Sequence, residues 1–172
     1  MDYNLYGTVT ADGVGVPGVV ISDGNLTVVT DKDGNYSIQS PKKRGYVFMS
    51  VPSGYEAPSD GALPRFYKLI DKNVDKIENV DFILNPVSGQ DNHIMYVLGD
   101  MHLAARNYDL DQFRTFANDL NNQITSNGSI KQYALTLGDM TWEVYWHQFT
   151  LSQYVAEINT QFPGLQIFHT IG

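Results

Sequence analysis

The tetrapeptide Leu-Gly-Asp-Met occurs twice in this chain, at residues 98–101 and 137–140. Each copy closes a short apolar run, and a third apolar run covers residues 165–171, just before Gly172. The segments between these runs are long enough to form helices. Strand, helix, strand, helix, strand is typical of a parallel sheet, where functional groups gather beyond the carboxyl ends of the strands. The repeat therefore predicts an α/β region with a site at one edge of its sheet.

Apolar residues at helical spacing predict two helices between the three runs. The first is expected to begin at Asp109, with Gln112 as its reciprocal capping partner, and to end at Asn127-Gly128. The second is expected over residues 143–160, before Pro163-Gly164.

The sequence up to residue 88 follows a different pattern, in which Asp-Gly pairs recur every ten or eleven residues. Such pairs favour tight hairpins because glycine readily adopts positive φ. Runs rich in β-branched and aromatic residues predict strands at 5–10, 19–22, 26–30, 36–38, 46–51 and 80–84. This spacing predicts a small antiparallel β-sandwich, with residues 58–64 as a long surface loop.

Residues 85–92 are polar, contain Pro and Gly and lack periodicity, which is typical of a linker. The predicted fold class is therefore multi-domain, with an all-β sandwich at residues 1–88 followed by an α/β (βαβαβ) domain at residues 89–172.

Composition excludes several classes of function. Acidic residues outnumber basic ones by 19 to 11, and a net charge of −8 makes nucleic acid an unfavourable partner. The chain has no cysteine, which excludes disulfides, thiolate metal sites and a cysteine nucleophile. No apolar stretch is long enough to predict a membrane span. The compartment stays open, with a periplasmic or extracellular location favoured over the cytoplasm.

Three side chains at the expected strand ends are candidate metal ligands. Asp100 and His102 are two residues apart, so in an extended segment they project to the same side. Asp139 follows the next strand, whose backbone would lie about 4.8 Å away if the strands are neighbours. Two carboxylates and an imidazole favour Zn, Mn or Fe over Ca or Mg. A carboxylate that bridges two such ions is an arrangement used in phosphoester hydrolysis.

These motifs resemble those of a known enzyme family. Gly99-Asp100-Met101-His102, Gly138-Asp139 and Thr170-Ile171-Gly172 resemble the opening Asp-x-His, Gly-Asp and Gly-Asn-His motifs of calcineurin-like metallophosphoesterases. The resemblance implies two divalent transition-metal ions, with Asp100 and His102 binding the first and Asp139 bridging both. It also implies a phosphoester substrate and a metal-dependent hydrolase.

Gly172 corresponds to the glycine of the third motif, so the following Asn and His, the later histidines and the general acid are expected beyond it. The chain is accordingly expected to be an incomplete, inactive portion of the enzyme. We also expect truncation to expose the edge of the strand at residues 165–171, which would lead to self-association or partial disorder.

The first region carries a resemblance of its own. Residues 6–9, 18–24 and 30–36 resemble a transthyretin-like or carboxypeptidase-regulatory-like sandwich, and residues 51–55 follow as in bacterial phosphoesterases that carry such a domain. The alternative is a non-catalytic two-domain protein whose sandwich binds a carbohydrate or a protein. A sugar-binding face would draw on a set of aromatic residues for which core packing is the favoured role: Tyr46, Phe48, Tyr55, Phe66 and Tyr67.

Other polar residues carry weaker signals. Residues 31–35 imitate the start of an EF-hand loop, but its twelfth position is Lys42 rather than Glu, which favours a simple turn. His147 is expected on a helix surface or packed within it, and His93 in solvent. His169 is expected to face the sheet, with a supporting role near the metal as a less favoured alternative.

Overall fold

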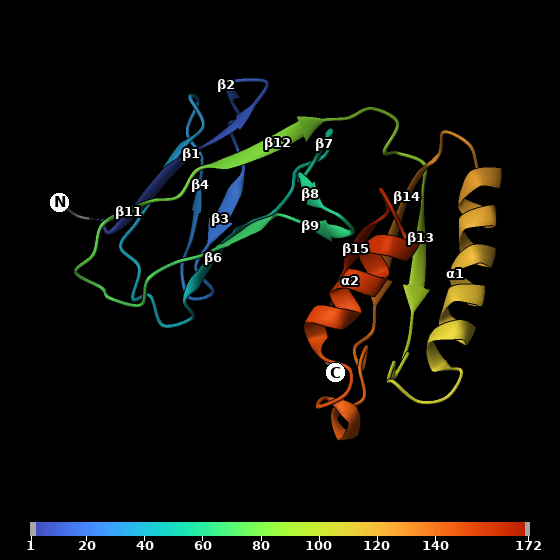
Figure 1. Cartoon of the computed structure of the whole chain (residues 1–172). Coiled ribbons are helices and arrows are strands. Elements are labelled where there is room, and N and C mark those ends of the chain that lie inside the picture. The colour runs from blue at the N-terminus through green and yellow to red at the C-terminus, as the bar shows by residue number, and fades with distance from the viewer. Residues whose placement is uncertain (1–2, 171–172) are drawn as a thin grey trace. The chain divides into compact units, whose positions relative to one another are not determined.

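The computed structural model describes residues 3–170, which divide into two compact units (Figure 1). The first unit comprises the described residues up to Pro58 together with Arg65–Ser88. The second unit comprises Ser59–Pro64 and the described residues from Gly89 onward. Strands predominate, and the described residues contain two α-helices.

The first unit contains two main sheets. One is built around β1 (Leu5–Ala11), and its other strands are β2 (Val14–Gly15), β5 (Asn35–Ile38), β7 (Tyr55–Glu56), β11 (Glu78–Asn79) and β12 (Phe82–Pro86). The other is antiparallel, in the order β10 (Tyr67–Leu69), β6 (Tyr46–Met49), β3 (Val20–Ser22) and β4 (Thr27–Val29).

The expectation of a wholly antiparallel sandwich is wrong for the first sheet. β1 pairs antiparallel with β2 and β5, but it pairs parallel with β11 and β12, Val9 lying opposite Phe82. Parallel neighbours need a long crossover. The long segment between β1 and β11 supplies that crossover, which strand spacing alone does not reveal.

Both sheets contribute to a single core. Burial alternates along β1, as it does when one face of a strand covers a core. The buried cluster takes side chains from β1, β3, β6 and β12, among them Leu5, Val9, Ile21, Val47, Met49, Phe82 and Leu84. Two sheets that share one core form a sandwich.

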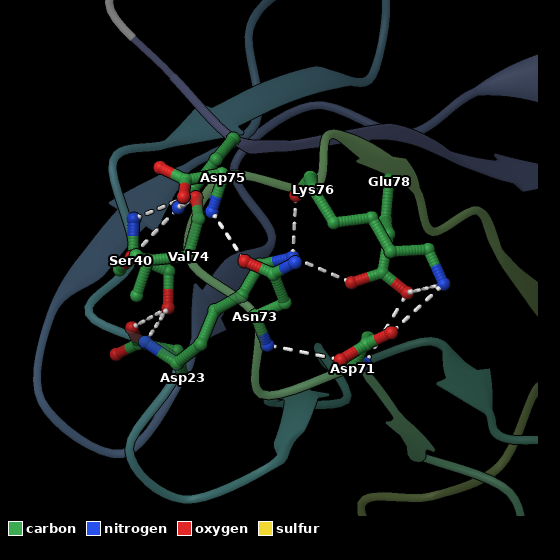
Figure 2. A network of polar contacts seen from close by, with 10 residues as sticks. Asp23, Ser40, Asp71, Asn73, Val74, Asp75, Lys76 and Glu78 are labelled. Carbon is green, nitrogen blue, oxygen red and sulfur yellow. Dashed lines mark hydrogen bonds and ion pairs between the residues drawn. The ribbon is translucent and has the colours of Figure 1, made fainter.

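A polar network lies within the first unit (Figure 2). The ammonium group of the buried Lys42 donates to the carbonyl of Lys76 and to the carboxylate of Glu78, both at 2.6 Å. The Glu78 carboxylate also accepts from the backbone amide of Asp71 at 3.3 Å, and the Asp71 carboxylate accepts from the side chain of Lys76 at 3.1 Å. The buried Lys42 ammonium group is thus held by the Lys76 carbonyl and the Glu78 carboxylate, and the amide of Asp71 also binds that carboxylate.

The second unit contains a parallel sheet in the order β13 (His93–Leu98), β14 (Lys131–Thr136) and β15 (Gln166–Phe168). Helix α1 (Asp109–Ser126) connects the first two strands, and helix α2 (Leu151–Gln161) precedes the third. This is the order that the three apolar runs predict. The core contains Phe113, Ala117 and Leu120 from α1 and Tyr154 and Ile158 from α2.

The predicted capping box of the first helix is wrong. Tyr108, at φ 71°, is the N-cap, and its side chain makes no capping hydrogen bond. The Asp109 carboxylate instead accepts a 2.6 Å hydrogen bond from Nε of Arg106. Asp109 is therefore the first residue within the helix, where its carboxylate pairs with Arg106, and not the N-cap.

The second helix is shorter than predicted. Residues Glu143–Tyr145 form a separate 3-10 turn, η1, and α2 begins only at Leu151. Thr150 and Gln153 form the capping box that fixes this start, with hydrogen bonds of 2.8 Å from the Thr150 amide and 3.3 Å from the Gln153 amide. The capping box therefore separates α2 from the 3-10 turn η1.

The predicted surface loop at residues 58–64 is also wrong. It contains a hairpin, β8 (Ser59–Asp60) and β9 (Leu63–Pro64), that belongs to the second unit. Ala62 at its turn is fully buried, and its carbonyl accepts a 2.7 Å hydrogen bond from the amide of Ile167 in β15. The expectation that the edge of the strand at residues 165–171 is uncovered is therefore wrong at Ile167. Self-association of the chain stays a prediction.

Candidate metal centre

The two Leu-Gly-Asp-Met repeats lie side by side at the carboxyl edge of the parallel sheet. β13 and β14 pair in register up to Leu98 and Thr136, and the amide of Leu137 then donates to the carbonyl of Leu98 at 2.9 Å. Beyond the strands, the amide of Leu103 donates to the carbonyl of Met140 at 3.0 Å. The parallel pairing thus resumes past the strand ends and aligns the two loops.

The backbone is left-handed at all three candidate ligands. Asp100, His102 and Asp139 have φ values of 52°, 44° and 48°. A side-chain-bearing residue in this conformation costs about 1–3 kcal/mol, and such residues cluster at functional sites. Asp and His are among the residues that accept it most readily. The local backbone thus favours these residue types, and its strain is consistent with a functional role.

The three candidate ligands converge. One ligand atom from each of Asp100, His102 and Asp139 can be chosen so that all lie within 4.8 Å of one another. His102 Nε2 lies 2.6 Å from a carboxylate oxygen of Asp100. Asp100 and Asp139 are exposed and His102 is half-buried, so solvent and ions reach the group.

This donor set fits a transition-metal ion. Bonds of about 2.0–2.2 Å to nitrogen and oxygen place two ligands of one ion at most about 4.4 Å apart. Small side-chain rotations would bring the three donors into that range, with the contact between Asp100 and His102 replaced by bonds to the ion. Two carboxylates and an imidazole suit Mn, Fe or Zn.

Aromatic and cationic side chains surround this group. The ring of Trp142 meets that of His102 edge-on, with centroids 5.8 Å apart and planes at 88°. The guanidinium carbon of Arg106 lies 4.5 Å from the ring centroid of Trp142 and 5.8 Å from that of Tyr145. A cavity of about 260 Å³ opens beside them, lined by Met101, His102, Leu103, Arg106, Asp109, Gln112, Phe113 and Phe116.

Sequence patterns did not single out Arg106 or Trp142. Each follows a candidate ligand by three or four residues, Arg106 after His102 and Trp142 after Asp139. That spacing is a weak signal by itself, because their contact depends on the alignment of the two loops.

The remaining histidines lie apart from the group among the described residues. Nε2 of His169 lies 3.0 Å from the hydroxyl of Tyr154, and its Nδ1 lies 3.1 Å from the carbonyl of Ile167. Burial lowers the pKa of His169, which favours its neutral form. His93 is exposed, as expected. His147 is also exposed, but it lies in a turn before α2 and not on the predicted helix. Ile171 and Gly172 of the third motif lie outside the described residues.

The EF-hand-like segment is a turn, as predicted. One carboxylate oxygen of Asp31 accepts hydrogen bonds from the backbone amides of Asp33 and Asn35, each at 2.9 Å.

The predicted aromatic face is divided between core and surface. Tyr55 and Phe66 pack against the core, whereas Tyr67 is partly exposed and lies opposite Phe48 in the antiparallel sheet.

Comparison with known families relates the N-terminal part of the chain to calcineurin-like phosphoesterases. Residues 3–87 match the family described as the N terminal of calcineurin-like phosphoesterase. No curated protein gives a significant match. The matched segment ends before Asp100, so it supports the metallophosphoesterase class independently of the metal-ligand motifs.

Neither described helix is long and apolar enough to cross a membrane.

Proposed function

We propose that this chain carries part of the metal centre of a calcineurin-like phosphoester hydrolase. Asp100 and His102 would bind one divalent ion, and Asp139 would bridge it to a second. The convergence of these three side chains on one sheet edge is the observation that carries the proposal. The family match over residues 3–87 supports it from a different part of the chain.

Each residue has a definable role in such a site. Divalent ions bound here would activate water and stabilise negative charge on the phosphoryl oxygens. The parallel loop pairing holds the carboxylates of Asp100 and Asp139 beside each other, and Trp142 covers one edge of His102. The exposure of both carboxylates leaves room for a phosphoester to approach.

Three ligands are fewer than two ions require. We therefore propose that further ligands and the general acid come from outside the described residues, and that the described ligand set alone supports little turnover. The transthyretin-like character of the first unit is part of the same proposal. It rests on the motifs in residues 6–36 and on the shared core of the two sheets.

Calorimetric titration with Mn²⁺ and with Zn²⁺ tests the metal assignment. Asp139→Asn should weaken binding by at least about tenfold, since loss of even an indirect partner of a metal ligand costs that much. Asp119→Asn removes an exposed carboxylate from α1 and should leave binding unchanged. Equal binding by the wild type and Asp139→Asn would refute the proposed centre.

A second candidate function is ligand binding by the first unit. A cavity of about 680 Å³ there is lined by aromatic and polar residues that include Tyr3, Tyr6, Thr8, Asn35 and Asn79. Such a surface is compatible with a carbohydrate, whose rings stack on aromatic side chains. Saccharide binding lost in Tyr6→Ala, with metal binding intact, would favour this function.

A further inference from the structure

We propose that Arg106 binds an anionic oxygen of the phosphoester and that the cavity beside it receives the organic part of the substrate. This inference rests on the proposed phosphoester hydrolase function and adds the residue that would recognise the substrate. Three features support it: how the guanidinium is held, what lines the cavity, and how charge is distributed around it.

The Arg106 guanidinium is held in a fixed orientation. Its Nε donates a 2.6 Å hydrogen bond to Asp109, and its central carbon lies over the rings of Trp142 and Tyr145. Such contacts favour arginine over lysine, because only a planar guanidinium both stacks and offers several donors. Since Asp109 engages Nε, the terminal Nη groups are the donors that a ligand would meet.

Arg114, on the same helix as Asp109, provides a contrast. It donates from both Nε and Nη2 to the two oxygens of Glu157, at 2.7 and 3.1 Å. That bidentate pair occupies the edge of the guanidinium with which arginine binds phosphate in other proteins. Arg114 therefore serves as a control of the same residue type in the same unit.

The cavity has a polar side and an apolar side. Polar groups come from His102, Arg106, Asp109 and Gln112. Phe113 and Phe116 contribute aromatic surface. His102 lines the cavity and is also a candidate metal ligand, so the cavity opens directly at the metal centre. A phosphoester could place its phosphoryl oxygens near His102 and its organic group against Phe116.

Charge supports the same assignment. The chain carries a net charge of −8, and Asp100 and Asp139 place two carboxylates at the site. An anionic substrate needs positive groups to overcome that repulsion. Arg106 is the one permanently cationic side chain among the residues that line the cavity, and its partner Asp109 is the one carboxylate among them.

Binding of inorganic phosphate tests the proposal. We would measure it by calorimetry with and without Mn²⁺, and by the fluorescence of Trp142. The chain has two tryptophans, so Trp146→Phe leaves Trp142 as the single indole reporter. Phosphate should change the Trp142 emission, because the guanidinium that binds phosphate lies on that ring.

Arg106→Gln should weaken phosphate binding by about tenfold or more, given the usual strength of charge-assisted hydrogen bonds. Arg106→Lys should give an intermediate loss, and Arg114→Gln should bind phosphate like the wild type. Mn²⁺ titrated alone should bind all four proteins equally, which separates failure of this inference from failure of the metal centre.

Two results would overturn the inference. One is phosphate affinity in Arg106→Gln or Arg106→Lys that equals that of the wild type. The other is a Trp142 emission that phosphate does not change, in a protein whose circular dichroism shows it to be folded. This second readout requires no substitution at Arg106, so it stands even if those variants fail to fold.

Discussion

The backbone amide of His102 donates a 2.8 Å hydrogen bond to the carbonyl of Asp139, which joins two candidate metal ligands that are 37 positions apart in sequence. The contact fixes the spacing of the two loops independently of any side chain. It also explains how both residues keep left-handed backbones, since the pairing that surrounds them offsets the local strain.

Backbone strain at Asp139 predicts that glycine there is more stable than alanine, although both substitutions remove a candidate metal ligand. Asp139 has φ 48°, a conformation that costs an ordinary residue about 1–2 kcal/mol and glycine little. We expect Asp139→Gly to be more stable than Asp139→Ala by about 1 kcal/mol. Both should lose the increase in melting temperature that we expect Mn²⁺ to produce in the wild type. Thermal unfolding with and without Mn²⁺ measures both effects.

Asp119→Gly and Asp119→Ala are the controls for that comparison. Asp119 lies within α1, where glycine is less stable than alanine by up to about 1 kcal/mol. The order of stability should therefore be reversed. The same order at both positions would contradict the strain interpretation.

The hairpin turn at Gly61 should tolerate no side chain. Gly61 has φ +59°, and a Cβ added there would lie 2.4 Å from side-chain atoms of Asn159, which accepts the amide of Ala62 at 2.8 Å. Gly61→Ala should therefore destabilise the second unit by about 2–3 kcal/mol, from backbone strain together with the lost hydrogen bond. Urea unfolding of the full chain measures the change.

Gly128→Ala separates strain from collision. Gly128 has nearly the same φ, +61°, but no atom lies within 4 Å of an added Cβ. Its substitution should cost only the strain of about 1–2 kcal/mol. If both variants lose the same stability, packing of Asn159 on the hairpin contributes nothing.

The buried cation of the first unit should be sensitive to substitution. Lys42→Met removes the charge that holds the Glu78 carboxylate and the Lys76 carbonyl, so both lose a 2.6 Å partner. We expect a loss of about 3 kcal/mol, as for other broken buried ion pairs. Lys32→Met removes an exposed ion pair with Asp33 and should change stability by less than about 0.5 kcal/mol. Denaturant unfolding of the two variants checks the contrast.

The same network predicts acid sensitivity. Burial opposes ionisation of Glu78, but hydrogen bonds from Lys42 and from the amide of Asp71, with the charges of Lys42 and Lys76, outweigh it and lower its pKa. A carboxyl whose pKa is lowered in the folded state stabilises the protein above its unfolded pKa, 4.5 for Glu. That contribution is lost as the pH falls through the lowered folded pKa.

Unfolding free energies measured from pH 6 downward test this expectation. Stability should decline below a pH of about 4.5, and Glu78→Gln should show a shallower decline because it lacks the titrating group. Identical slopes in the two proteins would mean that other carboxyls, such as Asp23, account for acid sensitivity. Burial opposes ionisation of Asp23, and hydrogen bonds from Ser40 and from the amides of Leu26 and Asn25 lower its pKa overall.

Local sequence was sufficient for the order of elements in the second unit and for three candidate ligands. The apolar runs before Gly99 and Gly138 have the length and composition of buried strands, and parallel strand direction places the residues after both runs at one edge. Asp100, His102 and Asp139 could therefore be found without coordinates. Their chemistry depends on residue type and on their position after a strand, and both are visible in sequence.

Tertiary structure decided what depends on partners distant in sequence. Residues 59–64 have the composition of a loop, and only their hydrogen bonds to Ile167 and Asn159 make them part of the second unit. Arg106 meets Trp142 only after two loops align in parallel. Such contacts form when the chain brings remote segments together, and no local pattern of residues specifies them.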